Sequence, residues 1–117
     1  MTPKQFAKYL ERDGSCYHCG DVETAVPNHR ANRGIGGSKK RDHPANIIVL
    51  CSEVNGLIES DALWASKARE YGWKLNSWDD PFWVPVFDAV WGVWWLLDDE
   101  WNRTRLSPLR DPRDRPF

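Results

Sequence analysis

The chain has 117 residues, which is enough for one domain with a small core and too few for two independent catalytic domains. Its 16 lysines and arginines against 17 aspartates and glutamates give a formal net charge of -1, which excludes a uniformly basic protein that coats nucleic acid. The three cysteines are an odd number, and two of them form a CxxC, so we expect a reducing, cytoplasmic setting and no disulfide framework.

The N-terminal segment MTPKQFAKYLERDG is polar and lacks the apolar stretch of a secretory signal. No apolar run approaches the roughly 20 residues of a membrane span. The most apolar run, VWGVWWLL, is short and is followed by three acidic residues. The sequence therefore predicts a protein that does not enter a membrane.

A helix is predicted at the N-terminus, with Thr2 as its N-cap, Pro3 as its first residue and Gly14 as its end. Its apolar stripe consists of Phe6, Tyr9 and Leu10. The CYHCG segment then forms a tight knuckle. Residues 22–29 have the β-branched density of a strand, although Pro27 limits that strand to an edge position.

The segment RGIGGSKKRD has too many glycines for a regular element and is predicted to be a flexible loop. Residues 46–51, NIIVLC, are the clearest strand in the chain because they are apolar and β-branched. Ser52 then predicts the start of a helix that runs to about Tyr71, and Gly72 ends it.

All eight tryptophans lie from Trp64 onward. The prolines in DDPFWVPV exclude a central strand or a helix interior, whereas GVWWLLDDEWN predicts a strand or the edge of a hairpin. The segment RDPRDRPF is a charged tail that we expect to be loosely ordered. Such dense aromatics indicate core and edge packing; a base-stacking platform or a partner-docking face is the alternative.

Single features in the middle of the chain are weak indicators. A CxxC is typical of a metal knuckle but also of two buried thiols, and a redox protein would need a thioredoxin-like βαβ context that is missing here. The GxGG segment opens no helix, so it fails the test for a dinucleotide site. The window from residue 30 to 41 holds a local basic patch that suits phosphate, with a solvated loop as the alternative. Its basic residues are Arg30, Arg33, Lys39, Lys40 and Arg41.

Taken together and in order, the segments CYHC, NHRANRGIGGS, PANIIVLC and VNGLIES resemble the HNH endonucleases, the ββα-metal nucleases. The resemblance is closest to small HNH proteins encoded by bacteriophages. It extends through DDPFWVPV and WWLLDDE and so covers most of the chain to about residue 100.

The resemblance implies a role for four residues of this chain. His29 matches the first H, the general base that takes a proton from the attacking water. Asn46 matches the central N, which braces the turn and orients the base. Asn55 matches the final H, a metal ligand at the helix start, and Asn28 matches the second metal ligand, which is usually Asp or His.

Phosphodiester hydrolysis agrees with those roles. It requires a base that works near neutral pH, which His supplies, and a cation such as Mg²⁺ or Mn²⁺ that absorbs developing charge. Arg30 and Arg33 are expected to hold flanking phosphates. Because Asn28 and Asn55 are both neutral, Glu59, one helical turn beyond Asn55, is a further ligand to consider. His43 is another, on a loop.

A structural zinc ion is a second metal that the resemblance suggests. Related proteins that hold one use four cysteines. Here Cys16, Cys19 and Cys51 are present, but the fourth position matches Val54. His18 or a water would have to complete the site; the alternative is a cluster of packed thiols.

The predicted fold is therefore α+β: a small ββα-metal core with an N-terminal helix and a Trp-rich strand and loop extension. We expect a single domain over residues 1–117. Its parts are a helix (1–15), the CxxC knuckle and core (16–72), the Trp-rich extension (73–101) and a flexible tail (102–117).

The predicted function is a metal-dependent DNA endonuclease or nickase. The resemblance further implies a phage protein in the host-cell cytoplasm that acts beside the terminase subunits in genome packaging or maturation. The alternative is an inactive or weakly active HNH-fold module that binds DNA as a packaging accessory.

Overall fold

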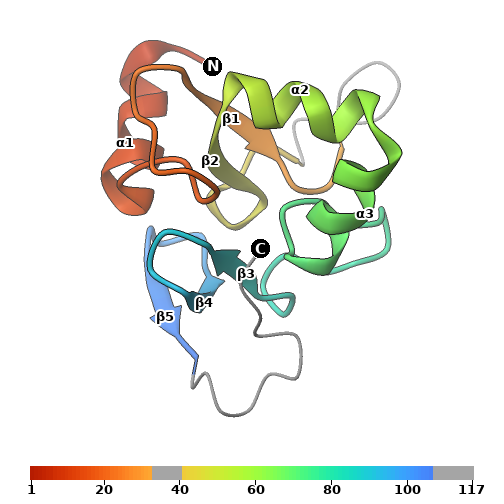
Figure 1. Cartoon of the computed structure of the whole chain (residues 1–117). Helices are drawn as coiled ribbons and strands as arrows, with labels where there is room; N and C mark the ends of the chain where they lie inside the picture. Colours follow the sequence, from red (N-terminus) through yellow and green to blue (C-terminus); the bar gives the residue numbers. More distant parts are fainter. Residues whose placement is uncertain (33–40, 107–117) are drawn as a thin grey trace.

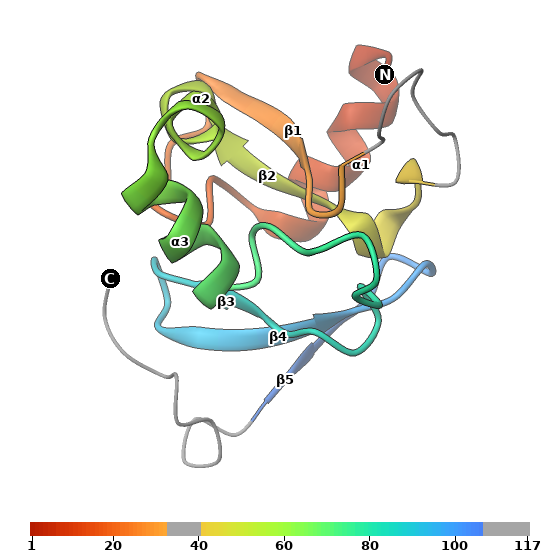
Figure 2. The same cartoon turned by 90° about the vertical axis from the view of Figure 1, so that its right-hand side faces the viewer.

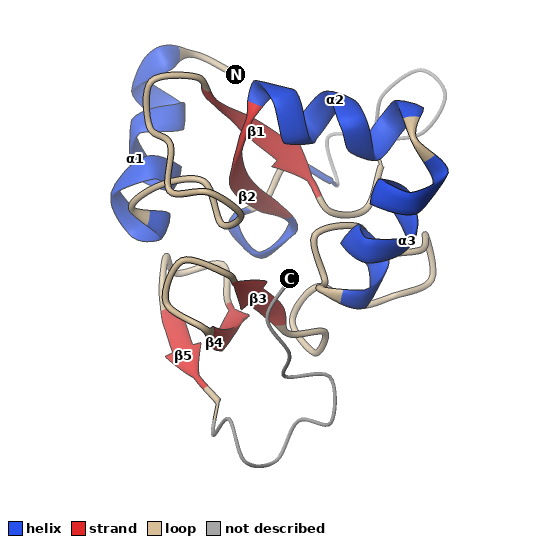
Figure 3. Ribbon diagram, in the orientation of Figure 1, coloured by secondary structure: helices blue, strands red, loops and turns tan. Residues whose placement is uncertain are grey.

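A computed structural model describes residues 1–32 and 41–106 of the chain (Figure 1). Within these residues it contains three α-helices and two antiparallel sheets, which confirms the predicted α+β class (Figure 3). The elements are α1 (Pro3–Asp13), β1 (Ala25–His29), a 3₁₀ turn (Pro44–Asn46), β2 (Ile47–Cys51), α2 (Ser52–Ser60), α3 (Ala62–Glu70), β3 (Val86–Asp88), β4 (Val93–Leu97) and β5 (Arg103–Arg105). None of the helices in the described ranges is long and apolar enough to cross a bilayer.

The first sheet is an antiparallel pair of β1 and β2, in which Asn28 lies opposite Ile48 and His29 opposite Ile47. All five residues of β2 are buried because both faces of the strand are covered. Alternate side chains point to opposite faces of a strand. Ile47 and Val49 therefore pack with Tyr9 of α1, whereas Ile48 and Leu50 pack in the same cluster as the apolar side of α2.

The helix α1 begins and ends where the sequence predicts. Thr2 and Gln5 form a reciprocal capping box, and Gly14 takes φ 81° just past the last turn. A buried ion pair then fixes α1 to the first sheet: Arg12 donates to the Ile47 carbonyl, and Asp13 accepts from the Val49 amide. The strand β2 is thus held at two points from the α1 side.

The prediction of a single helix over residues 52–71 is wrong, because Asp61 divides this segment into α2 and α3. Asp61 is extended, with φ -124° and ψ 124°, and its carboxylate accepts hydrogen bonds from the amides of Leu63 and Trp64. Asp61 therefore ends α2 and caps α3, which is a position that Asp favours over a helix interior. Gly72 follows α3, and a Cβ atom added to Gly72 would lie 2.0 Å from the Pro85 carbonyl oxygen.

The second sheet has the order β3-β4-β5 and lies beneath the first, with the segment after α3 running between them (Figure 2). Its aromatic side chains form most of the main core, including the fully buried Trp73 and Trp94. Trp78, Trp83 and Trp91 are 75–80% exposed, so the tryptophans are divided between packing and surface. The predicted flexible tail over residues 102–117 is wrong in its first part, because residues 103–105 form β5 and pair with β4. Residues 107–117 lie outside the described part.

Candidate functional site

Two side-chain amides meet between the first sheet and α2. Asn28 is 1% exposed near the end of β1, and its Nδ2 donates to the Trp73 carbonyl at 2.8 Å. Its Oδ1 accepts a hydrogen bond from Nδ2 of Asn55 at 3.1 Å. Asn55 lies in the first half of α2, 27 residues along the chain. The structure therefore brings the two expected metal ligands together.

The amide pair opens onto a hollow of about 380 Å³, here called the amide hollow. Its lining residues are Pro27, Asn28, His29, Asn32, Asn55, Glu59 and Lys74. The expected general base and both expected metal ligands therefore line one space. The first sheet and α2 create that space, because β1 supplies His29 and Asn28 while α2 supplies Asn55 and Glu59.

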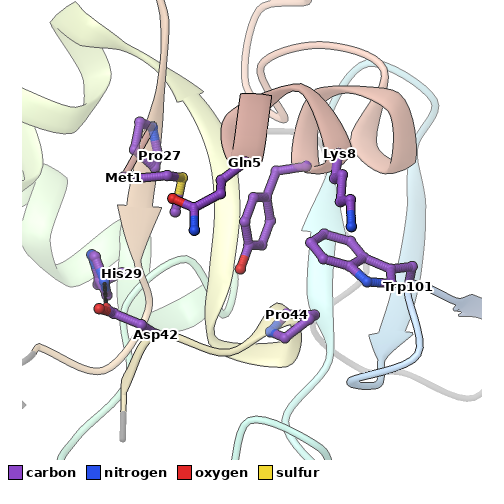
Figure 4. Close-up of a pocket in the computed structure, with 9 residues that line it drawn as sticks. Met1, Gln5, Lys8, Pro27, His29, Asp42, Pro44 and Trp101 are labelled. Carbon is purple, nitrogen blue, oxygen red and sulfur yellow. Dashed lines mark hydrogen bonds and ion pairs between the residues drawn. The ribbon is translucent and has the colours of Figure 1, made fainter. Parts of the chain in front are cut away.

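The imidazole of His29 is fixed by a carboxylate that the sequence did not single out. Nε2 of His29 lies 2.7 Å from Oδ1 of Asp42, and about a quarter of the imidazole is exposed. Asn28 and His29 are neighbours on a strand, so their side chains leave it on opposite faces. Residue His29 lines the amide hollow, and its ring, together with Asp42, borders a second pocket (Figure 4).

Asn46 ties together the two ends of the connection between β1 and β2. Its Oδ1 accepts from the Ala31 amide at 2.9 Å, and its Nδ2 donates to the carbonyls of Ala31 and Arg41 at 3.0 and 2.9 Å. Asn46 is completely buried. These contacts brace the segment that follows His29 and the segment that precedes Asp42, which is the kind of position expected of this residue.

Lys74 brings a positive charge into the amide hollow. Its Nζ donates to the His29 carbonyl at 2.9 Å and to Oδ1 of Asn32 at 2.7 Å, and it pairs with Glu59 at 2.9 Å. Only 11% of the Lys74 side chain is exposed. No sequence motif pointed to Lys74, because it lies 45 residues beyond His29 and reaches the site only through the fold.

The expected contact between Arg30 and phosphate is wrong for this geometry. Arg30 is 0% exposed, and its guanidinium donates to four backbone carbonyls. These belong to Gly72, Ala45, Pro81 and Val84. Burial lowers the pKa of Arg30 to about 10, which still leaves the group charged at neutral pH. Arg30 therefore joins the first sheet to the segment after α3 and has no free face for a ligand.

The remaining residues that were expected to bind phosphate or metal do not line the amide hollow or lie outside the described residues. Arg41 is half-buried and donates to the Ser77 carbonyl at 3.0 Å. Arg33, Lys39 and Lys40 lie outside the described residues. His43, considered as a metal ligand, is instead 2.8 Å from Asp99 and stacks on Phe82, and it does not line the amide hollow.

The three cysteines form a separate cluster that could hold a metal ion. Their sulfur atoms all lie within 4.8 Å of one another, with Cys16 and Cys51 buried and Cys19 exposed. Burial raises the pKa of the Cys16 thiol to about 11, so a bound cation would have to displace its proton. His18 does not belong to this group in the described part of the chain; its ring packs edge-on against Trp64 and Trp73.

No family model, curated protein or solved structure matches this chain. We therefore infer its function from the side chains themselves. The residues that line the amide hollow include a histidine whose imidazole is held by a carboxylate, three asparagines, a lysine and a glutamate. That set can move a proton, bind an oxyanion and supply oxygen ligands to a hard cation.

Proposed function

We propose that this protein is a metal-dependent DNA endonuclease or nickase of the HNH type. The observation that carries the proposal is the meeting of His29, Asn28 and Asn55 in one hollow. These are the residues that the HNH resemblance names as base and metal ligands. Two antiparallel strands followed directly by a helix are also the arrangement that a ββα-metal core requires.

His29 is the general base of the proposed reaction. If Nε2–H donates to Asp42, Nδ1 keeps its lone pair and takes a proton from a water molecule. The water oxygen then attacks phosphorus, and the bond to the leaving 3′ oxygen breaks. Asp42 holds the ring in one tautomer and orientation, as the third member of a catalytic group commonly does.

A divalent cation, Mg²⁺ or Mn²⁺, would supply charge stabilisation for the phosphate and the leaving oxygen when bound. The donor set fits a hard cation, because amide and carboxylate oxygens are the ligands it prefers. Asn28 offers Oδ1, which now accepts from Asn55, and Glu59 offers a carboxylate. Asn55 would have to turn its amide to present oxygen. Lys74 adds a fixed positive charge beside these groups.

The remaining expectations become parts of the same proposal. Arg41 with Arg33, Lys39 and Lys40 would contact the DNA backbone. The three-cysteine cluster would hold a structural zinc ion, with a water as fourth ligand. The likeness of the sequence to phage proteins supports a role beside the terminase, in genome packaging or maturation.

One observation favours a second function, a DNA-binding module without catalysis. Asn28 Oδ1 already accepts a hydrogen bond from Asn55 Nδ2, Asn28 Nδ2 donates to the Trp73 carbonyl, and both amides are neutral. A site built this way binds a cation less strongly than one with charged ligands. On this second proposal the fold keeps its DNA contacts as a packaging accessory and cleaves nothing.

His29→Ala tests the nuclease proposal. The variant should lose metal-dependent cleavage of plasmid DNA while its DNA affinity and melting temperature stay close to those of the parent, because His29 is partly exposed. His43→Ala is the matched control: it removes a histidine of similar exposure that pairs with Asp99 outside the hollow, so it should still cleave. Equal cleavage by the parent and His29→Ala would show that another group is the base.

A further inference from the structure

A second pocket lies on the other side of His29, here called the indole pocket (Figure 4). It has a volume of about 460 Å³, within the range of small-molecule sites. Its lining residues are Met1, Gln5, Lys8, Tyr9, Pro27, His29, Asp42, Pro44 and Trp101. Pro27 and His29 line both spaces, so the indole pocket lies next to the amide hollow along β1.

Apolar and polar surfaces share the walls of this pocket. Tyr9 and Trp101 meet edge to face, with ring centroids 4.7 Å apart, and Pro27 and Pro44 also line it. The polar side chains are those of Gln5, His29, Asp42 and Lys8, and the Lys8 ammonium stands 5.7 Å from the centre of the Trp101 ring. Aromatic walls next to polar groups suit a planar heteroaromatic ring that also forms hydrogen bonds.

Aromatic surface distinguishes the indole pocket from the amide hollow. The side chains of Lys8 and Asp42 carry opposite charges and lie at opposite ends of the pocket, as Figure 4 shows. The amide hollow likewise contains one lysine and one carboxylate, Lys74 and Glu59, which form an ion pair. The two spaces therefore differ in the rings of Tyr9 and Trp101, which line only the indole pocket, and not in the balance of these charges.

The backbone at Trp101 has an unusual conformation, and two neighbouring carboxylates hold its turn in place. Trp101 has φ 67°, the only positive φ among non-glycine residues in the described ranges, and such a value is unfavourable for a bulky side chain. The Asp98 carboxylate accepts from the amides of Glu100 and Asn102, and its hydrogen bonds with Asn102 lower the pKa of Asp98. Asp99 anchors the same turn to the Ala45 amide at 3.0 Å. Strained residues held in this way concentrate at ligand sites.

We propose that the indole pocket receives the base of an unpaired nucleotide next to the phosphate held in the amide hollow. This inference rests on the proposed function, since the phosphate places the base. A base inside a duplex is stacked and cannot enter a pocket, so the nucleotide is single-stranded or extruded. Stacking against Trp101 accepts any base, which predicts a preference for DNA structure rather than sequence.

Binding of short single-stranded DNA in the presence of a chelator tests the inference without cleavage. Oligonucleotides carry 2-aminopurine, or an abasic residue, at each position in turn, and affinity is measured by fluorescence anisotropy. We expect 2-aminopurine to be quenched at one position, and an abasic residue there to weaken binding about tenfold. Trp101→Phe should retain most of the quenching and Trp101→Ala should lose it.

Trp91→Ala is the control, because Trp91 is 75% exposed and lies outside both spaces; it should bind like the parent. If abasic residues at every position leave the affinity of the parent unchanged, the inference is overturned, whether or not Trp101→Ala folds. Cleavage of plasmid DNA without any abasic effect would reject the pocket and keep the nuclease. An abasic effect without cleavage would keep the pocket and reject the nuclease.

Discussion

Replacing Arg30 should destabilise the fold strongly and leave phosphate contacts untouched. The guanidinium is 0% exposed and donates to four carbonyls from three separate segments of the chain. Arg30→Met keeps much of the apolar stem but removes every donor. Four carbonyl oxygens then lose their partner, and the contacts to Gly72, Ala45 and Pro81 are buried, so water cannot readily replace the guanidinium there.

The expected loss follows from that count. Hydrogen bonds to charged groups contribute about 1.5–3 kcal/mol each, and breaking a buried charged network typically costs about 3–5 kcal/mol in all. A small domain has a total free energy of unfolding of about 5–15 kcal/mol. With urea m-values of about 1–3 kcal/mol/M, the midpoint of unfolding should fall by about 1 M or more.

Urea unfolding followed by tryptophan fluorescence measures this loss. Arg41→Met is the matched control, because Arg41 is half-buried and makes a single hydrogen bond to the Ser77 carbonyl; it should change stability by only about 0.5 kcal/mol. The Arg30→Met defect should persist in high salt, which screens exposed charges and leaves buried ones largely unaffected. An Arg30→Met protein that unfolds like the parent but binds DNA poorly would refute the structural role and restore the phosphate contact.

Three further predictions concern other parts of the chain. Asp61→Ala should cost about 1 kcal/mol of stability, since α3 loses its N-cap; unchanged urea unfolding would count against the break between α2 and α3. Zinc should raise the melting temperature of the chelator-treated parent and not that of Cys51→Ser, and equal shifts would exclude the cysteine cluster as the site. The triple replacement of Lys39, Lys40 and Arg41 by alanine should weaken binding of all DNA sequences alike. The slope of log affinity against log salt concentration should become shallower by about 0.9 for each phosphate that the variant no longer neutralises. A sequence-selective loss of affinity would contradict this prediction.

Local signals explain which parts of the fold could be predicted. The N-cap at Thr2 and the apolar β2 depend on neighbouring residues, and both are found as expected. The break at Asp61 was missed because apolar spacing continues across it, and a capping carboxylate outweighs that spacing. β5 was missed because Arg103–Arg105 is a polar edge segment that forms only by pairing with β4.

In the candidate site too, local sequence patterns predict some residues and tertiary contacts bring in the others. The pattern around Asn28, His29 and Asn55 named three residues that the structure places in one hollow. Asp42 and Lys74 reach His29 only through tertiary contacts, so no spacing in the sequence indicates them. The phosphate contact predicted for Arg30 is wrong because its partners are also distant in the sequence. An arginine beside a basic loop suggests a phosphate contact, and only the fold shows the carbonyls that enclose Arg30.

Conversion of supercoiled plasmid to nicked or linear DNA is the most direct measurement of the central proposal. Parent protein and Asn55→His are compared with Mg²⁺, with Mn²⁺ and with a chelator. The nuclease proposal predicts cleavage by the parent with a divalent ion and none with the chelator, and a shift towards Mn²⁺ in Asn55→His, because imidazole suits that ion better than Mg²⁺. No cleavage by the parent under any condition, with cleavage by Asn55→His, would contradict it and establish the protein as a DNA-binding module that has lost its metal.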